Sequence, residues 1–264
     1  MKPNLTMKLS LLIFLLHVFS VRANDDVSGP DVRSLGLGNV HALSQEMVNP
    51  AYLSFYSGAQ AGVTVINRFG IKELNVYRIS GMIPGPFVDM GVKIASENLG
   101  DYNRIRCSAG FSKMIFKGFG IGANLHYDFR SLNGGLDNSN DLTFDIGCRY
   151  ALTNQVNLAL LGKQVATIRS ATRFMLYSGV SYEMIPSFVL LLEAGADFND
   201  LFFITGGLEV EFSDSLFFRA GIQSHLRSPA IGASYQFQQI KVDVSFSLHQ
   251  VLGKSSAVCL TYCF

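Results

Sequence analysis

The sequence predicts an all-β fold: a transmembrane antiparallel β-barrel of about 14 strands, with 12 as the alternative count, and a short N-terminal hatch segment. Three observations lead to this prediction. Of the 264 residues, 48% are hydrophobic and only 16% are charged, and glycine and phenylalanine are abundant at 25 and 21. Past the N-terminus, no run of roughly 18 apolar residues could form a membrane-spanning helix. Instead, segments of roughly ten residues alternate apolar and polar side chains, as strands between lipid and a polar lumen do.

Charge and composition exclude several classes. Lys and Arg total 21 against 20 for Asp and Glu, so the formal charge is +1. A nucleic-acid binder usually carries a basic excess, so we expect no nucleic-acid partner. The high apolar and aromatic content also argues against a disordered chain. A mean hydropathy of +0.27 is high for a soluble protein.

The N-terminal residues 1–23 are typical of a Sec-type signal peptide. Lys2 and Lys8 precede the apolar stretch 9–21, and small side chains before Asn24 favour cleavage after Ala23. The stretch is too short for a spanning anchor, which is the other interpretation. We therefore expect a multi-pass protein in the outer membrane of a Gram-negative bacterium.

Residues 24–59 form the predicted hatch or plug segment, because strand alternation is absent there. A short helix is expected near Val40 to Met47. Pro50 fixes its own φ and keeps the residue before it out of the helical region, so such a helix must end earlier. The sequence Asn49-Pro50-Ala51 therefore predicts a fixed turn inside the lumen or at its periplasmic mouth, with the Asn side chain capping local backbone groups.

Residues 60–264 carry the barrel pattern. From Phe119 to Arg130 the odd positions are apolar, and the even positions are polar or glycine. Period 2 over this length indicates a strand. The same reasoning gives the expected strands 60–68, 72–80, 87–96, 103–116, 118–130, 140–151, 155–165, 172–183, 187–198, 201–212, 215–225, 230–237, 239–248 and 256–264.

Turn lengths support the count independently. Bacterial barrels have short periplasmic turns and longer outer loops. Alternate connections here are short, at 117–118, 153–154, 185–186, 213–214 and 238–239, and most others are longer. The last strand places Val258, Leu260, Tyr262 and Phe264 on one face. This resembles the signal read by the β-barrel assembly machinery, the partner expected during biogenesis.

The hatch segment also carries a resemblance. Arg33-Ser34-Leu35-Gly36-Leu37-Gly38-Asn39, followed by Asn49-Pro50-Ala51, resembles the entry motif of FadL-like barrels. It resembles most closely the Bacteroidetes PorV/PorQ group linked to type IX secretion, with Glu46 where that group carries an acidic stretch. The resemblance implies that the segment folds into the lumen as a hatch. We accordingly expect Gly36 and Gly38 to allow close approach to the barrel wall.

Charged residues of both signs recur on the predicted lumen faces. An interior salt-bridge lattice is favoured over an ion path, because no ring of a single sign is present. The residues are Arg104, Arg106, Asp128, Arg130, Asp141, Asp145, Arg149, Lys163, Arg173, Glu183, Glu193, Asp197, Glu209, Glu211, Arg219, Lys241 and Asp243.

No catalytic, cofactor or metal site is expected. His126, His225 and His249 fall on lumen faces, but HExxH and GxSxG motifs are absent. Of the cysteines, Cys107 and Cys148 are assigned to lipid faces and Cys259 and Cys263 to the lumen. The roles of the last two stay open, because ~13 Å of strand between them prevents a disulfide.

Two functions remain. The first is a non-enzymatic subunit or docking partner of a secretion or outer-membrane assembly complex, with other outer-membrane or periplasmic proteins as partners. The alternative is a FadL-like transporter of hydrophobic small molecules, with Leu35, Leu37, Val40 and Phe55 lining a pocket or simply packing the hatch.

Overall fold

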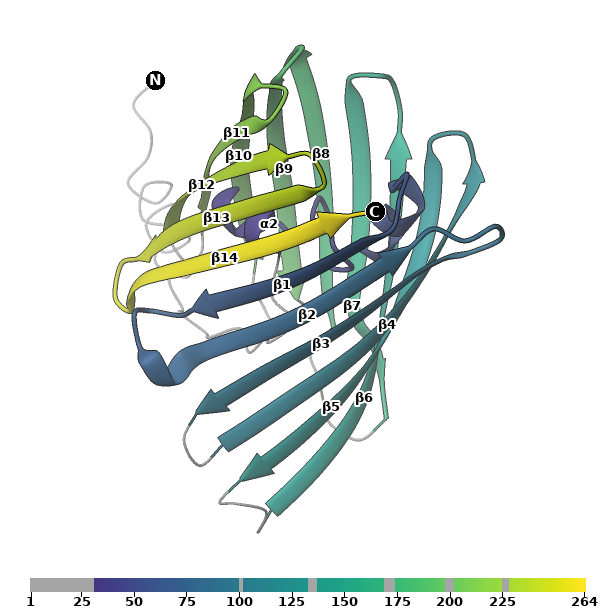
Figure 1. Ribbon diagram of the computed structural model, residues 1–264. Coiled ribbons are helices and arrows are strands. Elements are labelled where there is room, and N and C mark those ends of the chain that lie inside the picture. Colours follow the sequence, from purple (N-terminus) through teal and green to yellow (C-terminus); the bar gives the residue numbers. More distant parts are fainter. Residues whose placement is uncertain (1–30, 100–101, 133–136, 169–173, 198–201, 225–227) are drawn as a thin grey trace, which may run out of the picture.

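The computed structural model describes residues 31–99, 102–132, 137–168, 174–197, 202–224 and 228–264. The predicted signal peptide 1–23, and Arg173 and His225 of the lumen set, lie outside these ranges. The described residues form a closed barrel of 14 strands, in which each strand pairs with its neighbours along the chain and β1 pairs with β14 (Figure 1). The prediction of a 14-strand antiparallel barrel is confirmed, and the count of 12 is wrong.

The strands lie close to the predicted ranges. They are β1 Gln60–Asn67, β2 Asn75–Ile83, β3 Asp89–Leu99, β4 Tyr102–Phe116, β5 Phe119–Leu132, β6 Asp137–Ala151, β7 Val156–Thr167, β8 Met175–Ile185, β9 Phe188–Asp197, β10 Phe202–Ser213, β11 Leu216–Gln223, β12 Ser228–Phe237, β13 Ile240–His249 and β14 Gly253–Cys263. β2 is displaced by three residues at both ends, because a 3-10 turn, η2 Lys72–Leu74, precedes it.

Antiparallel ladders close the wall. Val63 lies opposite Leu260 of β14 on one side and opposite Ile79 of β2 on the other. Because the short connections 117–118, 186–187, 214–215 and 238–239 all lie at one end, we assign that end to the periplasm. The wall is uneven: β4 and β6 have 15 residues, whereas β1 and β11 have 8, so one side extends further outward (Figure 1).

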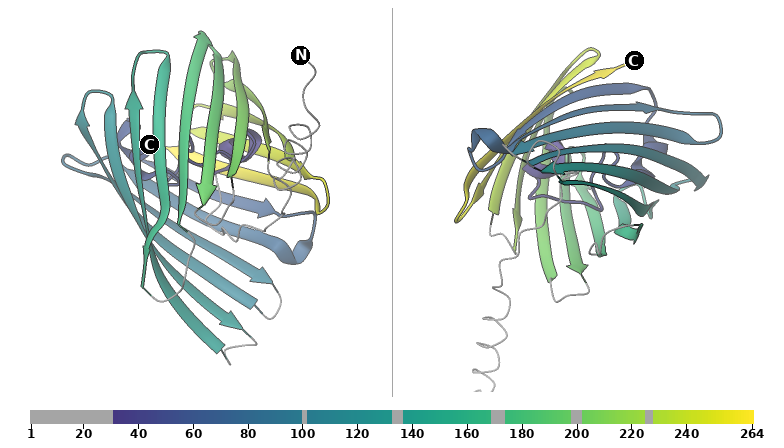
Figure 2. Two further views of the ribbon diagram at one scale, coloured as in Figure 1. Left: turned by 180° about the vertical axis from the view of Figure 1, so that it is seen from behind. Right: turned by 90° about the horizontal axis from the view of Figure 1, so that it is seen from below.

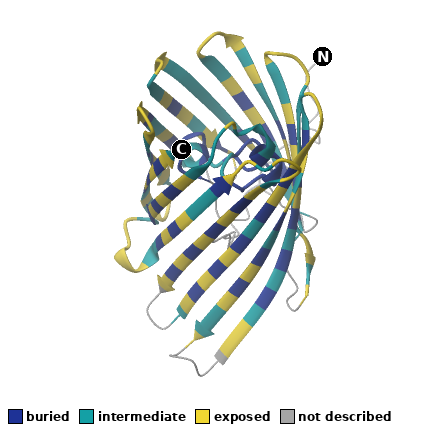
Figure 3. Ribbon diagram, turned by 45° about the vertical axis from the view of Figure 1, so that its right-hand side comes forward, coloured by how far each residue is buried: buried dark blue, intermediate teal, exposed yellow. Residues whose placement is uncertain are grey.

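The two faces of the wall follow the predicted alternation. On β6, Ile146 points outward and is 55% exposed, whereas Asp145 and Gly147 are buried inside. The stripes of alternating burial run along the strands around the barrel (Figure 3). Cys107 is exposed on the outer face and Cys259 is buried inside, as expected. An apolar outer surface and a polar inner one fit a barrel in hydrocarbon.

Residues 31–59 lie inside the barrel (Figure 2). They contain a short helix, α2 Val32–Gly36, and a 3-10 helix, η1 Pro50–Phe55. The predicted helix from Val40 to Met47 is wrong. Glu46 and Met47 adopt φ values of 50° and 65°, which a right-handed helix does not allow. Among the described residues, no helix is long and apolar enough to cross a bilayer.

Candidate functional site: the hatch in the barrel lumen

An ion-pair chain fixes the start of the hatch to the wall. Arg33 donates from Nε and Nη2 to both carboxylate oxygens of Glu209 on β10, at 2.9 and 2.7 Å. Glu209 also accepts from Arg219 on β11, which donates in turn to Asp243 on β13 at 3.0 Å. Such bidentate arginine–carboxylate pairs fix orientation as well as position. Arg33 of the predicted motif is therefore a link between the hatch and three strands.

Asp31 begins α2 and ties two turns of the hatch together. Its carboxylate accepts the backbone N–H of Ser34 at 2.6 Å as an N-cap, and the hydroxyl of Ser44 at 2.7 Å. N-caps of this kind satisfy backbone donors that a helix start leaves free. The helix start and the following turn therefore form one unit.

Glu193 anchors the middle of the hatch. This fully buried carboxylate on β9 accepts the backbone N–H groups of His41, at 2.8 and 3.0 Å, and of Leu43, at 3.2 Å. The ring of His41 lies 4.4 Å from the ring of Tyr177 on β8. A buried carboxylate needs such donors, so hatch and wall stabilise each other here. In the sequence Glu193 is merely one of many lumen acids, and nothing local marks it as an anchor.

Asn49 caps η1 and bonds to the wall at the same time. Its Oδ1 accepts the N–H of Ala51 at 3.1 Å. Its Nδ2 donates to the carbonyl of Ala42 at 2.7 Å and to that of Leu160 on β7 at 3.2 Å. Pro50 follows at the first helical position, where its missing N–H costs nothing. The tripeptide therefore lies buried inside the lumen as a compact turn.

Glycines on the wall make room for the hatch. A Cβ on Gly147 would lie 2.0 Å from Oδ1 of Asn49, and one on Gly122 would lie 2.6 Å from the carbonyl carbon of Pro50. Gly36 approaches Gly232, and Gly38, at φ +85°, approaches the backbone of Ile222. Wall glycines whose Cβ would meet the hatch within 3.2 Å are Gly91, Gly110, Gly120, Gly122, Gly147, Gly179, Gly207, Gly221 and Gly232.

The lumen wall has an apolar sector. Inward side chains on β7 to β10, among them Leu161, Met175, Tyr177 and Phe203, form one buried cluster with the hatch. Leu37 and Val40 belong to that cluster, and Leu35 packs against a second one, so these residues pack the hatch. Met175 and Phe203 lie at the outer ends of their strands. The sector therefore leads from the outer rim down to the hatch.

The rest of the interior carries the predicted lattice of opposite charges. Asp128 on β5 accepts from Arg106 at 2.6 and 2.7 Å and from Arg104 at 3.1 and 3.3 Å. The guanidinium of Arg149 lies over the rings of Tyr52 and Phe55, at 4.6 and 4.0 Å from their centroids. The described residues therefore contain interior ion pairs of the kind that the lattice interpretation predicts.

His126 belongs to this lattice. Its Nε2 lies 2.9 Å from Asp145 and its Nδ1 2.7 Å from the hydroxyl of Ser108, and all three side chains are buried. Among the described residues no group of three His, Cys, Asp or Glu side chains could hold a metal ion. We interpret His126 as a satisfied interior histidine, since it has a partner on each ring nitrogen.

Glu46 in the hatch has a raised pKa. Burial and the nearby carboxylates of Asp31 and Asp243 raise the pKa of Glu46 to about 7, although Lys241 and Lys93 oppose the shift. Its backbone N–H donates to the hydroxyl of Tyr56 at 3.3 Å. The carboxyl group of Glu46 therefore changes its charge near neutral pH.

The C-terminal strand closes the barrel. Val258, Leu260, Tyr262 and Phe264 are all outward-facing and between 40% and 75% exposed. The Tyr262 and Phe264 rings make an edge contact at 4.8 Å. Their role in assembly stays a prediction.

Comparisons with known proteins find similar folds at low identity. The structure titled CymD monoaromatic hydrocarbon channel gives a TM-score of 0.72 at 14% identity, covering 91% of this chain and 99% of that chain. The structure of the Pseudomonas putida toluene transporter TodX gives a TM-score of 0.66 at 13% identity, covering 93% of this chain and 98% of that chain. The structure of a Pseudomonas aeruginosa FadL homologue gives a TM-score of 0.69 at 11% identity, covering 92% of this chain and 99% of that chain. No family model and no curated sequence matches. The likeness shows a FadL-like barrel fold.

Proposed function

We propose that this chain is an outer-membrane channel that admits hydrophobic small molecules, the function expected above as the alternative. The observation that carries the proposal is the apolar sector of the lumen. A water-filled porin lumen is polar. Here Met175, Tyr177 and Phe203 form an apolar stripe that begins at the outer rim and reaches the hatch. Such a stripe offers a hydrophobic solute an apolar surface between the outer rim and the hatch.

The fold supports the same proposal. The similar structures named above include channels for monoaromatic hydrocarbons and a toluene transporter. Monoaromatic hydrocarbons are therefore the first solutes to test. In this proposal the hatch blocks the lumen at rest, because polar contacts from Arg33 and Asn49 fasten it to the wall.

A near-isosteric change at the rim tests the path. Met175→Gln places an amide at the outer end of the stripe, whereas Met184→Gln makes the same change on β8 at an exposed position near the other end. Uptake of toluene by cells that express the barrel is expected to fall in Met175→Gln, because a desolvated amide costs about 1–3 kcal/mol. Met184→Gln should transport like the wild type.

A heat-modifiable gel shift shows that each variant is folded. Equal uptake by both variants would place the path elsewhere. If cells with the folded wild-type barrel take up no more toluene than cells with an empty vector, the proposal fails.

The docking-subunit hypothesis is the second candidate, and the β2–β3 turn favours it. Phe87 in this turn is 80% exposed, next to Pro84 and Pro86, and Asp89 accepts the N–H of Gly85 at 3.1 Å. Aromatic side chains are enriched at protein–protein interfaces, so an exposed Phe on this turn suits such a contact. Large partners should then co-purify in mild detergent with the wild type and be lost in Phe87→Ser. The PorV/PorQ likeness and a Bacteroidetes source stay predictions.

A further inference from the structure

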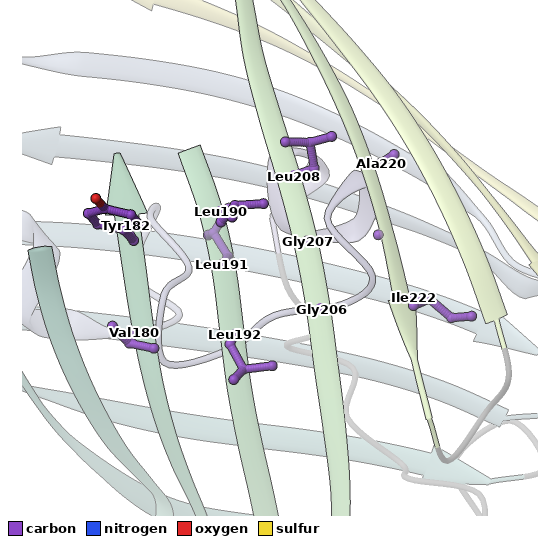
Figure 4. A pocket seen from close by; sticks show the side chains of 11 residues that line it. Val180, Tyr182, Leu190, Leu191, Leu192, Gly206, Gly207, Leu208, Ala220 and Ile222 are labelled. Atoms are coloured by element: carbon purple, nitrogen blue, oxygen red, sulfur yellow. The ribbon is translucent and has the colours of Figure 1, made fainter. Parts of the chain in front are cut away.

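The outer face of the wall carries a groove across four strands. It has a volume of about 610 Å³ and is lined by β8 to β11 (Figure 4). Two cross-strand rows form its sides, because the ladders align Tyr182, Leu190, Leu208 and Ala220 in one row and Val180, Leu192, Gly206 and Ile222 in the next. Each row has one gap, at Ala220 and at Gly206.

The gap at Gly206 is open. A Cβ added there would meet no atom within 4 Å. The flanking Leu192 and Ile222 are each 54% exposed. The groove is therefore continuous with the apolar outer belt of the barrel, and its occupant comes from the membrane.

The floor of the groove is rigid. It consists of β10 and β11 backbone at Gly207 and Gly221, and the main chain of Leu37 packs directly behind both glycines. Because the hatch supports the floor, the groove is preformed, which lowers the cost of filling it.

The polarity of the lining indicates the class of occupant. No charged side chain lines the groove, and the Tyr182 hydroxyl is the sole polar side-chain group among its lining residues. Tyr182 lies three residues from the periplasmic end of β8, whereas Ile222 lies near the outer end of β11. Tyrosine is favoured where one end of the ring is apolar and the other is wet. The lining therefore suits an occupant whose one polar end lies near Tyr182 on the periplasmic side.

We infer that this groove is a binding site for one acyl chain of a phospholipid from the periplasmic leaflet, with the headgroup near Tyr182 and the chain running past Gly206 toward Ile222. The inference stands apart from the proposed transport function, since it concerns the outer face of the wall.

Filling the groove tests the inference. Gly206→Leu fills the open gap, where a Cβ would meet no atom within 4 Å, and Ala220→Phe fills the gap in the other row. Ala123→Leu, also on the outer face but on β5, is the matched control. The full chain is extracted from membranes in mild detergent and its retained lipids are identified by native mass spectrometry.

Wild type and Ala123→Leu are expected to keep one phospholipid per chain under conditions that strip the others. Each methylene that no longer fits lowers affinity by roughly a factor of four, so occupancy should fall about tenfold or more in both groove variants. Full retention by folded Gly206→Leu and Ala220→Phe would overturn the inference. The inference would also be overturned if the wild type retained lipid A instead of a phospholipid, or if it retained no lipid.

Discussion

Replacement of Gly221 by alanine would test how tightly the hatch is fitted to the wall. The added Cβ would lie 2.1 Å from the carbonyl carbon of Leu37, 2.2 Å from its oxygen and 2.5 Å from the nitrogen of Gly38. Ordinary contact begins at 3.4 Å, so these backbone atoms must retreat by about 1.3 Å. Strand β11 is paired on both sides, so we expect the hatch to move and the wall to stay.

The cost of this overpacking is about 1–3 kcal/mol. Gly206→Ala is the matched control, because it adds the same methyl group to the neighbouring strand where nothing lies within 4 Å. Urea unfolding in lipid vesicles measures the stability of both variants, and planar bilayers measure their conductance. Gly221→Ala should be less stable by this amount and should conduct more than the wild type, which we expect to be nearly silent.

Gly206→Ala should match the wild type in both assays. If Gly221→Ala is as stable and as silent as Gly206→Ala, then the close contact between Leu37 and the wall does not hold the hatch in place. Equal loss in both variants would instead show that any added methyl group weakens this part of the wall.

Three further changes test the faces, the plug and the pH response. Ile146→Arg should cost about 2–4 kcal/mol in a bilayer folding assay because Ile146 faces lipid. Gly147→Arg should instead act inside the barrel by displacing Asn49. If the barrel tolerates both substitutions equally, the face assignment is rejected. Deletion of residues 24–57 should leave an insertable barrel that conducts in planar bilayers, and a large steady pore in the intact protein would contradict the plug. Because the pKa of Glu46 is raised from 4.5 to about 7, the docked hatch binds a proton more tightly than the released one, so docking weakens as pH rises through this window. Conductance should therefore rise between about pH 5 and about pH 8, and Glu46→Gln should abolish that rise.

The sequence alone determined the barrel. Alternation along 119–130 and 140–151 is a local signal, because each strand must present one face to lipid and the other to the lumen wherever it lies in the chain. The outward position of Ile146 follows from that period, whereas the period left the strand count at 14 or 12 and the closed barrel settled it at 14. The start of β2 was less predictable, since the 3-10 turn at Lys72–Leu74 carries apolar residues on either side.

Only the tertiary structure decided how the hatch folds and what holds it. Val40 to Met47 has helix-compatible residues, but the backbone at Glu46 and Met47 is left-handed. The Glu46 N–H donates to Tyr56 within the hatch, and the Met47 carbonyl accepts from Asn124 on the wall. The partners that fasten the hatch could not be read from the sequence either. Arg33 and Glu209 are 176 residues apart, and His41 and Glu193 are 152 apart. Such pairs meet only when the hatch lies against the inner wall, because a buried carboxylate finds its partner by position in the folded barrel rather than along the chain.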